Sequence, residues 1–153
     1  LRLAKQKIKK AEIILKRNQQ KAKNNFKKYL ITPEQEFVEA HSFLAIIENK
    51  EIPSLKSLKV SKESYVLGLL DCIGELKRLV LDNIRKDRLK EANRIFNVME
   101  NLYLVLYPLA MYDKIVKEAR RKLDVNRVLV EETRAVITEE IRRNHFINAL
   151  AEK

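Results

Sequence analysis

Hydrophobic residues recur at intervals of three and four positions at the start of the chain, which is the spacing of one face of an α-helix. The positions that follow this spacing are Leu1, Ala4, Ile8, Ala11, Leu15, Asn18, Ala22, Asn25 and Tyr29. Such a narrow stripe is typical of a long helix that packs along a single seam. We therefore predict a helix over residues 1–30, with its lysines largely outside the seam.

Local start and stop signals divide the rest of the chain into further helices. Thr32 followed by Pro33 predicts an N-cap and a helix over residues 33–49. Ser61 predicts the cap of a second helix over residues 61–86. The remaining predictions are helices over 89–107 and 113–140, a short tail helix over 142–153, a linker over 53–60 and a break at Pro108. The pattern indicates a single all-α domain, a bundle of about five to seven helices.

The composition of residues 1–153 excludes several other architectures. Two Gly and three Pro are too few for the turns of a sheet. The single cysteine, Cys72, excludes an internal disulfide and a cysteine-based zinc site, and we expect it in the core rather than as a nucleophile. The most apolar run, Leu102–Met111, is about half the length that spans a bilayer, so we predict that it is core. With no recognisable signal peptide, we expect a cytoplasmic protein without a membrane anchor.

The positive charge is concentrated at the start of the chain. Residues 1–28 hold eleven Lys or Arg and one acid, Glu12, so they carry a net charge of +10 of the formal +11. A helix with one packed seam and a basic outer surface suits a phosphate-rich partner such as a nucleic acid. The same charges also fit a solvated surface that binds nothing, and on charge alone both interpretations stay open.

Four acidic residues on two predicted helices form a pattern that fits metal binding. Glu36 and Glu39 point in the same direction as the apolar residues of their helix, and Asp71 and Glu75 lie one turn apart on the next helix. Carboxylates gathered in this way could hold Mg²⁺ or Mn²⁺, which prefer oxygen ligands. Such an ion activates a water molecule and stabilises a phosphoryl transition state.

The glycines and acids also have purely structural interpretations. Gly68 and Gly74 are the two glycines of the chain, and a helical glycine costs about 1 kcal/mol relative to alanine. They could clear space beside the carboxylates or permit two helices to pack closely. The acids could form salt bridges between helices, with Arg78 as a partner of Glu75. Neither histidine follows a Glu by three residues, so a di-iron centre of the Glu-x-x-His type does not fit.

Two stretches, "QEFVEAHSF" (residues 35–43) and "YVLGLLDCIGEL" (residues 65–76), resemble the translin family and specifically its Trax branch. The downstream stretches "LKEANRIFNVMENLYLVL" and "VNRVLVEETRAVI" continue the likeness, which covers most of the chain. Trax-like proteins are all-helical subunits of hollow oligomers, and they cleave RNA with a metal-dependent acidic cluster. The resemblance therefore implies that the catalytic and metal-binding residues are Glu36, Glu39, Asp71 and Glu75.

The resemblance also implies a role for the two glycines. Gly68 and Gly74 would leave room for metal and RNA phosphate beside Asp71 and Glu75. Two features depart from a eukaryotic Trax, since the connector before Ser61 is short and the stretch "RKDRL" lacks a glycine. Both departures fit a compact, prokaryotic homologue that assembles with itself.

The resulting hypothesis is a Mg²⁺-dependent endoribonuclease, with Mn²⁺ as an alternative ion, that acts on single-stranded or exposed RNA within a closed, octamer-like homo-oligomer. Single-stranded DNA is a further candidate ligand. The residues expected to contact RNA are Lys9, Lys16, Lys23, Lys27, His41 and Arg78. His41 also fits a structural role. Two alternatives stay open: a non-catalytic, translin-like module that binds nucleic acid, and a structural subunit whose basic helix contacts an acidic protein.

Overall fold

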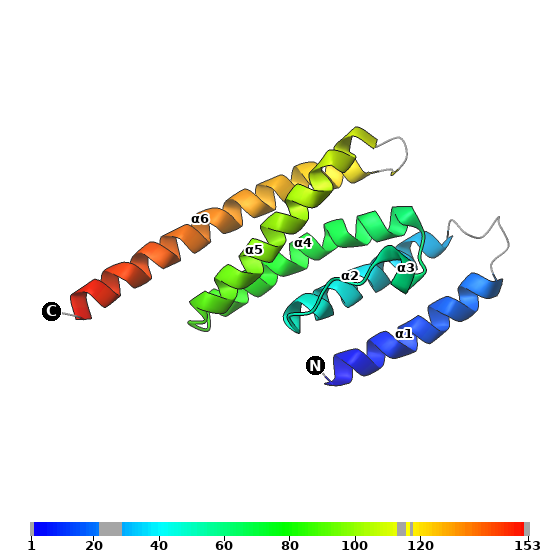
Figure 1. The fold of residues 1–153 in the computed structure, drawn as a ribbon, viewed down its shortest axis with the longest axis horizontal. Helices are drawn as coiled ribbons and strands as arrows, with labels where there is room; N and C mark the ends of the chain where they lie inside the picture. The colour runs from blue at the N-terminus through cyan, green and yellow to red at the C-terminus, as the bar shows by residue number, and fades with distance from the viewer. Residues whose placement is uncertain (1, 22–28, 113–115, 117, 152–153) are drawn as a thin grey trace.

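The computed structural model describes residues 2–21, 29–112, 116 and 118–151, which include six α-helices and the 3₁₀ segment η2, with residues 29–30 also in 3₁₀ conformation (Figure 1). The elements are α1 (Arg2–Lys21), α2 (Ile31–Ile47), α3 (Leu55–Leu58), α4 (Lys62–Ile84), α5 (Leu89–Leu106), the 3₁₀ segment η2 (Tyr107–Tyr112) and α6 (Ala119–Ala151). None of the described residues is in a β-strand. The predicted all-α bundle of about five to seven helices is confirmed.

Helix α4 lies at the centre of the bundle. It packs against α2, α5 and α6, whereas α1 packs mainly on α2 (Figure 1). Its fully buried side chains recur every three or four residues and include Leu70, Ile73, Leu76 and Val80. They share one hydrophobic core with Val38 of α2, Ile95 of α5 and Leu123 of α6. Because burial of each such side chain contributes about 1.5–3 kcal/mol, this four-helix contact is the main source of stability.

Two serine caps define how the chain enters α4. The Ser61 side-chain oxygen accepts a hydrogen bond from the backbone N–H of Ser64 at 3.1 Å, so the predicted cap is confirmed. The predicted linker over residues 53–60 contains the short helix α3, in which Ser54 accepts from the backbone N–H of Ser57 at 3.2 Å. Caps of this kind contribute about 1 kcal/mol each.

Two predicted helix boundaries are wrong. Thr32 is not an N-cap, because α2 begins at Ile31 and the backbone of Leu30 is already helical, with φ −90° and ψ −15°. An N-cap residue needs a non-helical backbone for its side chain to reach the first amides. No separate helix forms over the predicted tail, since α6 continues without interruption to Ala151 and its last turns extend beyond the rest of the bundle (Figure 1). Residue 113, the predicted start of the helix over 113–140, lies outside the described residues.

The apolar run Leu102–Met111 is only partly core. Leu102, Tyr103 and Leu106 are buried. Other side chains of the run are strongly exposed, namely Leu104 (58%), Val105 (74%), Tyr107 (55%) and Met111 (86%). Helix α5 ends at Leu106, and the chain continues as η2 through Pro108, so the predicted break is confirmed while burial of the full run is not. No helix in the described part of the chain is long and apolar enough to cross a membrane.

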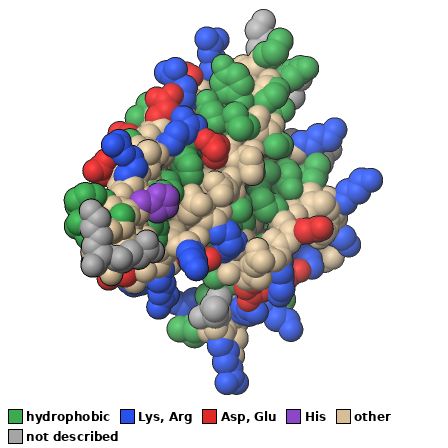
Figure 2. Space-filling model, turned by 60° about the vertical axis from the view of Figure 1, so that its left-hand side comes forward, with side chains coloured by type: hydrophobic (Ala, Val, Ile, Leu, Met, Phe, Trp, Pro, Cys, Tyr) green, Lys and Arg blue, Asp and Glu red, His purple; other side chains and the backbone are tan. Residues whose placement is uncertain are grey.

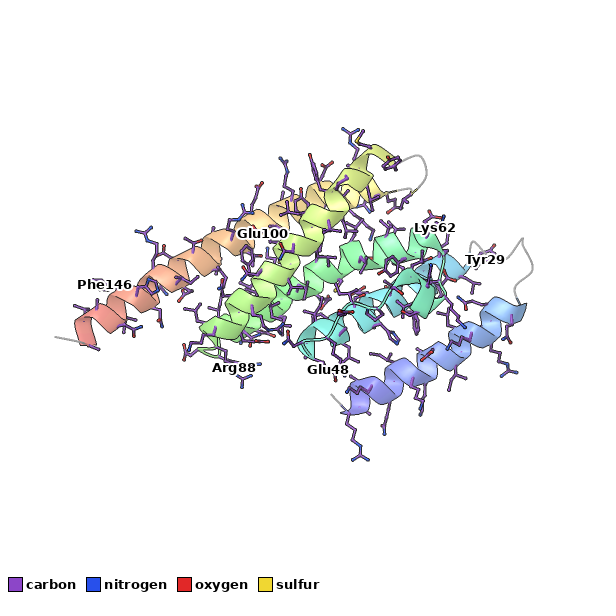
Figure 3. The ribbon with its side chains drawn as sticks, in the orientation of Figure 1. Tyr29, Glu48, Lys62, Arg88, Glu100 and Phe146 are labelled. Atoms are coloured by element: carbon purple, nitrogen blue, oxygen red, sulfur yellow. The ribbon has the colours of Figure 1, made fainter. Side chains whose placement is uncertain are left out.

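Helix α1 contacts the bundle along part of its predicted seam. Leu15 is buried and Ile8 is half-buried. The exposed seam positions are Ala4, Ala11, Asn18 and Tyr29, and the seam residues Leu1, Ala22 and Asn25 are outside the described side chains. Near its N-terminal end, α1 forms an ion pair through Lys5 with Glu48. Glu48 is labelled in Figure 3 at the end of α2. A cavity of about 370 Å³ remains between α1 and α2, so this contact is looser than the core around α4.

Gly68 and Gly74 have different surroundings. A Cβ atom on Gly68 would lie 2.5 Å from the carbonyl oxygen of Gln35 and 2.7 Å from Cβ of Val38, so the absent side chain is what allows α2 to approach α4. The expectation that Gly68 leaves room for metal and phosphate is therefore wrong. A Cβ on Gly74 would meet no atom within 4 Å, and this glycine does face open space.

The two glycines give a matched test of this packing. Gly68→Ala should destabilise the protein by about 1–3 kcal/mol, because α2 has to move away from α4. Gly74→Ala should leave stability unchanged or raise it by up to about 1 kcal/mol, because it improves helix propensity without a clash. Urea unfolding followed by circular dichroism measures both, and equal stabilities of the two variants would contradict the close helix contact.

Candidate functional site

Helices α2 and α4 bring the four predicted carboxylates into one electrostatic cluster. Glu36 is exposed, whereas Glu39, Asp71 and Glu75 are half-buried. The close contact at Gly68 holds the two helices together, and each pair of acids lies within one turn of its own helix. The charges of Glu36, Asp71 and Glu75 all act on Glu39, and Glu36 also lines the cavity between α1 and α2.

Glu39 shows how strongly these acids interact. Its pKa is raised to about 7, first by burial and then by the negative charges of Glu36, Asp71 and Glu75. Lys122 opposes the rise with its positive charge. A carboxyl with this pKa is partly protonated at neutral pH. The raised pKa means that burial and the neighbouring acids disfavour the negative charge of Glu39 more than Lys122 stabilises it.

Two of the four carboxylates are engaged by neighbouring side chains. Asp71 forms an ion pair with Lys122 through Oδ1 and accepts a hydrogen bond from the Gln35 amide through Oδ2. Glu75 accepts a hydrogen bond from Arg78 Nη1 at 2.7 Å within the same helix, as the structural interpretation of this pair expected. Helix α6 thus takes part in the site through Lys122.

Neither Gln35 nor Lys122 was among the predicted site residues. Gln35 directly precedes Glu36, so its inclusion follows from the motif once α2 and α4 are known to touch. Lys122 lies 51 residues after Asp71 and has no local signal, because its role depends on how α6 packs. That packing is fixed next to the site, where the Asn126 amide donates to the backbone carbonyl of Leu70 at 2.9 Å.

The cluster fits a hard divalent cation in its chemistry but not in its present side-chain positions. Four carboxylates supply the oxygen ligands that Mg²⁺ and Mn²⁺ prefer. Among the described residues, however, no three His, Cys, Asp or Glu side chains are arranged so that they could hold one ion. Asp71 is paired with Lys122, and Glu75 is paired with Arg78. A metal site at Glu36, Glu39, Asp71 and Glu75 therefore stays a prediction.

The predicted RNA contacts differ in their surroundings. Lys9 and Lys16 are exposed on α1, where Lys16 forms an ion pair with Glu12 one turn away. Lys23 and Lys27 lie outside the described residues. Arg78 is exposed but paired with Glu75, as described above. Over the face shown in Figure 2, Lys and Arg side chains lie between hydrophobic patches rather than forming one continuous basic surface.

His41 and Cys72 both have structural surroundings. His41 Nδ1 lies 3.0 Å from the backbone carbonyl oxygen of Phe37, and the two rings are 4.1 Å apart between centroids. These contacts favour the structural role for His41 over an RNA contact. Cys72 is fully buried, and burial, followed by the charges of the nearby acids, raises the pKa of its thiol to about 12. Such a thiol is a core residue and a poor nucleophile.

Comparisons with known proteins show the family of this chain and agree with its fold. The sequence model of a protein family, described as "Translin family", matches residues 2–137 of this chain. An uncharacterized protein of Methanocaldococcus jannaschii is 46% identical over 106 residues, which cover 69% of this chain, and the chain spans about half (47%) of that relative. The crystal structure of AfC3PO is similar with a TM-score of 0.77 and 30% identity, covering 91% of this chain and 75% of that one. The structure of the complex of AfC3PO with duplex RNA gives a TM-score of 0.77 at 28% identity, over 91% and 74% of the two chains.

The raised pKa of Glu39 predicts a pH-dependent loss of stability. Because the folded-state pKa of Glu39, about 7, lies above the ordinary value of 4.5, the contribution of Glu39 to stability is most favourable below about pH 4.5 and is lost as the pH rises through 7. Glu39→Gln, which cannot ionise, should therefore be more stable than the parent at pH 8. The difference should shrink toward pH 5.

Urea unfolding at both pH values, with a chelator present, measures this effect. Glu139→Gln, at an exposed acid of α6, is the matched control and should show no such pH dependence. A stability difference between Glu39→Gln and the parent that is the same at pH 5 and pH 8 would contradict the raised pKa.

Proposed function

Because this chain belongs to the translin family, we propose that it is a metal-dependent endoribonuclease of the Trax-like type. The observation that carries the proposal is that the charges of three other carboxylates, Glu36 on α2 and Asp71 and Glu75 on α4, act on Glu39. An acidic cluster that its own chain neutralises only in part is costly to a fold, and it is typical of sites whose charge is completed by a bound cation. The likeness to AfC3PO, which has been seen in a complex with duplex RNA, supports RNA as the ligand.

Glu36, Glu39, Asp71 and Glu75 would hold the ion, with Mg²⁺ as the first candidate and Mn²⁺ as the second. The ion, when bound, supplies an activated water molecule and stabilises charge on the phosphoryl group. The protein contributes the positions of the acids, which the rigid contact between α2 and α4 sets. It also contributes the low-polarity side of the site, since Asp71 and Glu75 border a fully buried stretch of α4.

The basic surface of α1 is proposed to bind the RNA backbone. Lys9 and Lys16 are exposed there, and α1 packs on α2, the helix that carries Glu36 and Glu39. Lysine contacts to phosphate position a nucleic acid without reading its sequence. We propose single-stranded or exposed RNA as the substrate, although AfC3PO was seen with duplex RNA, so binding of single-stranded RNA, duplex RNA and single-stranded DNA should be compared.

A non-catalytic nucleic-acid-binding module is the second candidate function. The observation that favours it is the pairing of Asp71 with Lys122 and of Glu75 with Arg78, which is what acids with a purely structural role would show. Both functions predict RNA binding, and only the first predicts cleavage that a chelator abolishes.

Assembly into an octamer-like homo-oligomer is part of the proposal. The exposed apolar side chains near the end of α5 and in η2, which we call the α5–η2 apolar face, are Leu104, Val105, Tyr107, Met111 and Tyr112. Several large apolar side chains exposed within nine residues of the chain are a candidate site of protein association. A closed assembly would place RNA in a chamber, where several basic helices act together.

Amide variants of the cluster test the chemistry apart from binding. Glu36→Gln, Glu39→Gln and Asp71→Asn should each lower cleavage of labelled RNA in Mg²⁺ by about 100-fold or more, because each removes one anionic ligand. RNA affinity should be kept or should rise, since less negative charge then faces the phosphates.

Cleavage and affinity are to be measured in parallel on the same preparations, with helicity as the check on folding. Glu139→Gln, outside the cluster, is the matched control and should cut at the parent rate. Variants of the cluster that fold, bind RNA and still cut at the parent rate would leave the binding module as the function. Glu75→Gln should lower the cleavage rate if Glu75 is a ligand of the ion. It should leave the rate unchanged if Glu75 only pairs with Arg78.

The α5–η2 apolar face gives a test of assembly. The parent protein should sediment at several times the mass of one chain at micromolar concentration. The double variant Val105→Asp/Met111→Asp should shift to smaller species, because both residues are strongly exposed in the isolated chain and charge there opposes burial. Asn97→Asp, at an exposed position two turns earlier on α5, is the control and should not change the mass. A parent protein that is a monomer would contradict the proposed assembly.

A further inference from the structure

Lys122 is placed at the acidic cluster by the start of α6. Its ammonium group pairs with Asp71 Oδ1, and the two side chains are largely shielded from solvent, with 19% and 26% of their surface exposed. The adjoining turn of α6 is fixed to α4 by the hydrogen bond from Asn126 to the Leu70 carbonyl. Lys122 therefore reaches the cluster from a third helix whose position is rigid, while its own four-carbon side chain is flexible.

Both oxygens of Asp71 have a partner within the chain. One oxygen is paired with Lys122 and the other accepts from Gln35. Each carboxylate oxygen has a second lone pair, but an ammonium and a divalent cation at one partly buried carboxylate repel each other, so each weakens the binding of the other. Gln35 is neutral, and its hydrogen bond to the other oxygen can persist. A metal ion that takes Asp71 as a ligand therefore competes with Lys122.

The structure offers a place for the displaced side chain. A cavity of about 240 Å³ lies between α4 and α6 beside the ion pair, and Asp71, Gly74, Arg121 and Lys122 are among the residues that line it. Gly74 has open space where a side chain would be, which leaves this cavity clear. Lys122 can thus leave Asp71 by rotation of its own side chain without movement of either helix.

We propose that Lys122 is a resident counter-cation of the acidic cluster, bound to Asp71 when no divalent ion is present and exchanged for that ion when it binds. This inference rests on the proposed function, because it assumes that the cluster takes a divalent cation. It explains how four carboxylates are tolerated in the empty cluster. It also explains why the described side chains are not arranged around one ion, although the backbone brings all four acids together. Lys122 is thus a positioning residue for Asp71.

The exchange predicts that Lys122 competes with the metal. Lys122→Met keeps the length of the aliphatic side chain but removes the charge, so it should bind Mn²⁺ at least about five-fold more tightly than the parent. Without metal it should also unfold at a lower temperature, since Asp71 then has no cation. Saturating Mn²⁺ should restore most of that loss.

Two matched variants separate exchange from a general effect of charge. Arg121→Met removes the same charge one residue away, where the side chain pairs with Glu118 instead of the cluster, and its Mn²⁺ affinity should equal that of the parent. Lys122→Arg keeps a cation that can pair with Asp71 and should also bind Mn²⁺ with about the parent affinity. Calorimetric titration with Mn²⁺ and thermal unfolding with and without the ion are the measurements, and helicity confirms that each variant is folded.

The outcomes distinguish this inference from the proposed function. If the parent and Lys122→Met bind Mn²⁺ equally, and Lys122→Met is destabilised to the same extent with and without metal, Lys122 is a fixed structural partner and the exchange is overturned while the metal site stands. If Arg121→Met tightens binding as much as Lys122→Met, the effect is bulk charge and the exchange is again overturned. If no variant binds Mn²⁺, both the exchange and the metal-dependent function are overturned.

Discussion

The close approach of α2 to α4 at Gly68 is the constraint on which the rest of the structure depends. Without a side chain at this position, the backbone of α2 reaches α4 and Val38 enters the core. The same approach brings the carboxyl of Glu39 on α2 near the charges of Asp71 and Glu75 on α4, so the contact that stabilises the bundle is also the one that concentrates negative charge. The same helix contact therefore stabilises the bundle and brings the acids together. A looser contact would lower the stability of the protein and reduce the repulsion between the acids.

The concentrated charge then determines what surrounds it. Lys122 pairs with Asp71, and Arg78 pairs with Glu75. Gln35 donates to the other oxygen of Asp71. The pKa of Glu39 is raised to about 7. The cluster is thus only partly neutralised by the chain itself. An arrangement built solely for stability would more readily use apolar residues at such half-buried positions, because a buried ion pair rarely exceeds them in stability. The incomplete neutralisation is the physical reason to assign the cluster a ligand.

Local sequence signals predicted those parts of the fold that local interactions decide. The cap at Ser61 and the break at Pro108 follow from the chemistry of one or two residues, and both are present. Thr32 fails as a cap because the chain before it is already helical, which the Thr-Pro signal does not report. The acids of the site could be chosen from their spacing and from the family motif, whereas Lys122 could not, since it reaches Asp71 only through tertiary packing of α6. The exposed half of Leu102–Met111 was missed for a similar reason, because hydropathy does not show which face of a helix has a neighbour.

A buried carboxylate outside the cluster relates the basic helix to the acidic cluster. Glu34 is 6% exposed, accepts a hydrogen bond from Gln19 of α1 at 2.8 Å, and accepts another from the backbone N–H of Ser61 at 2.9 Å. The start of α4 favours a negative charge because its backbone amides and helix dipole point toward it. Glu34 thus joins α1, α2 and the start of α4 at one point. Because α1 makes few other buried contacts, this carboxylate does much to fix where the exposed lysines of α1 lie relative to Glu36 and Glu39, and so couples the surface proposed to bind RNA to the cluster proposed to cleave it.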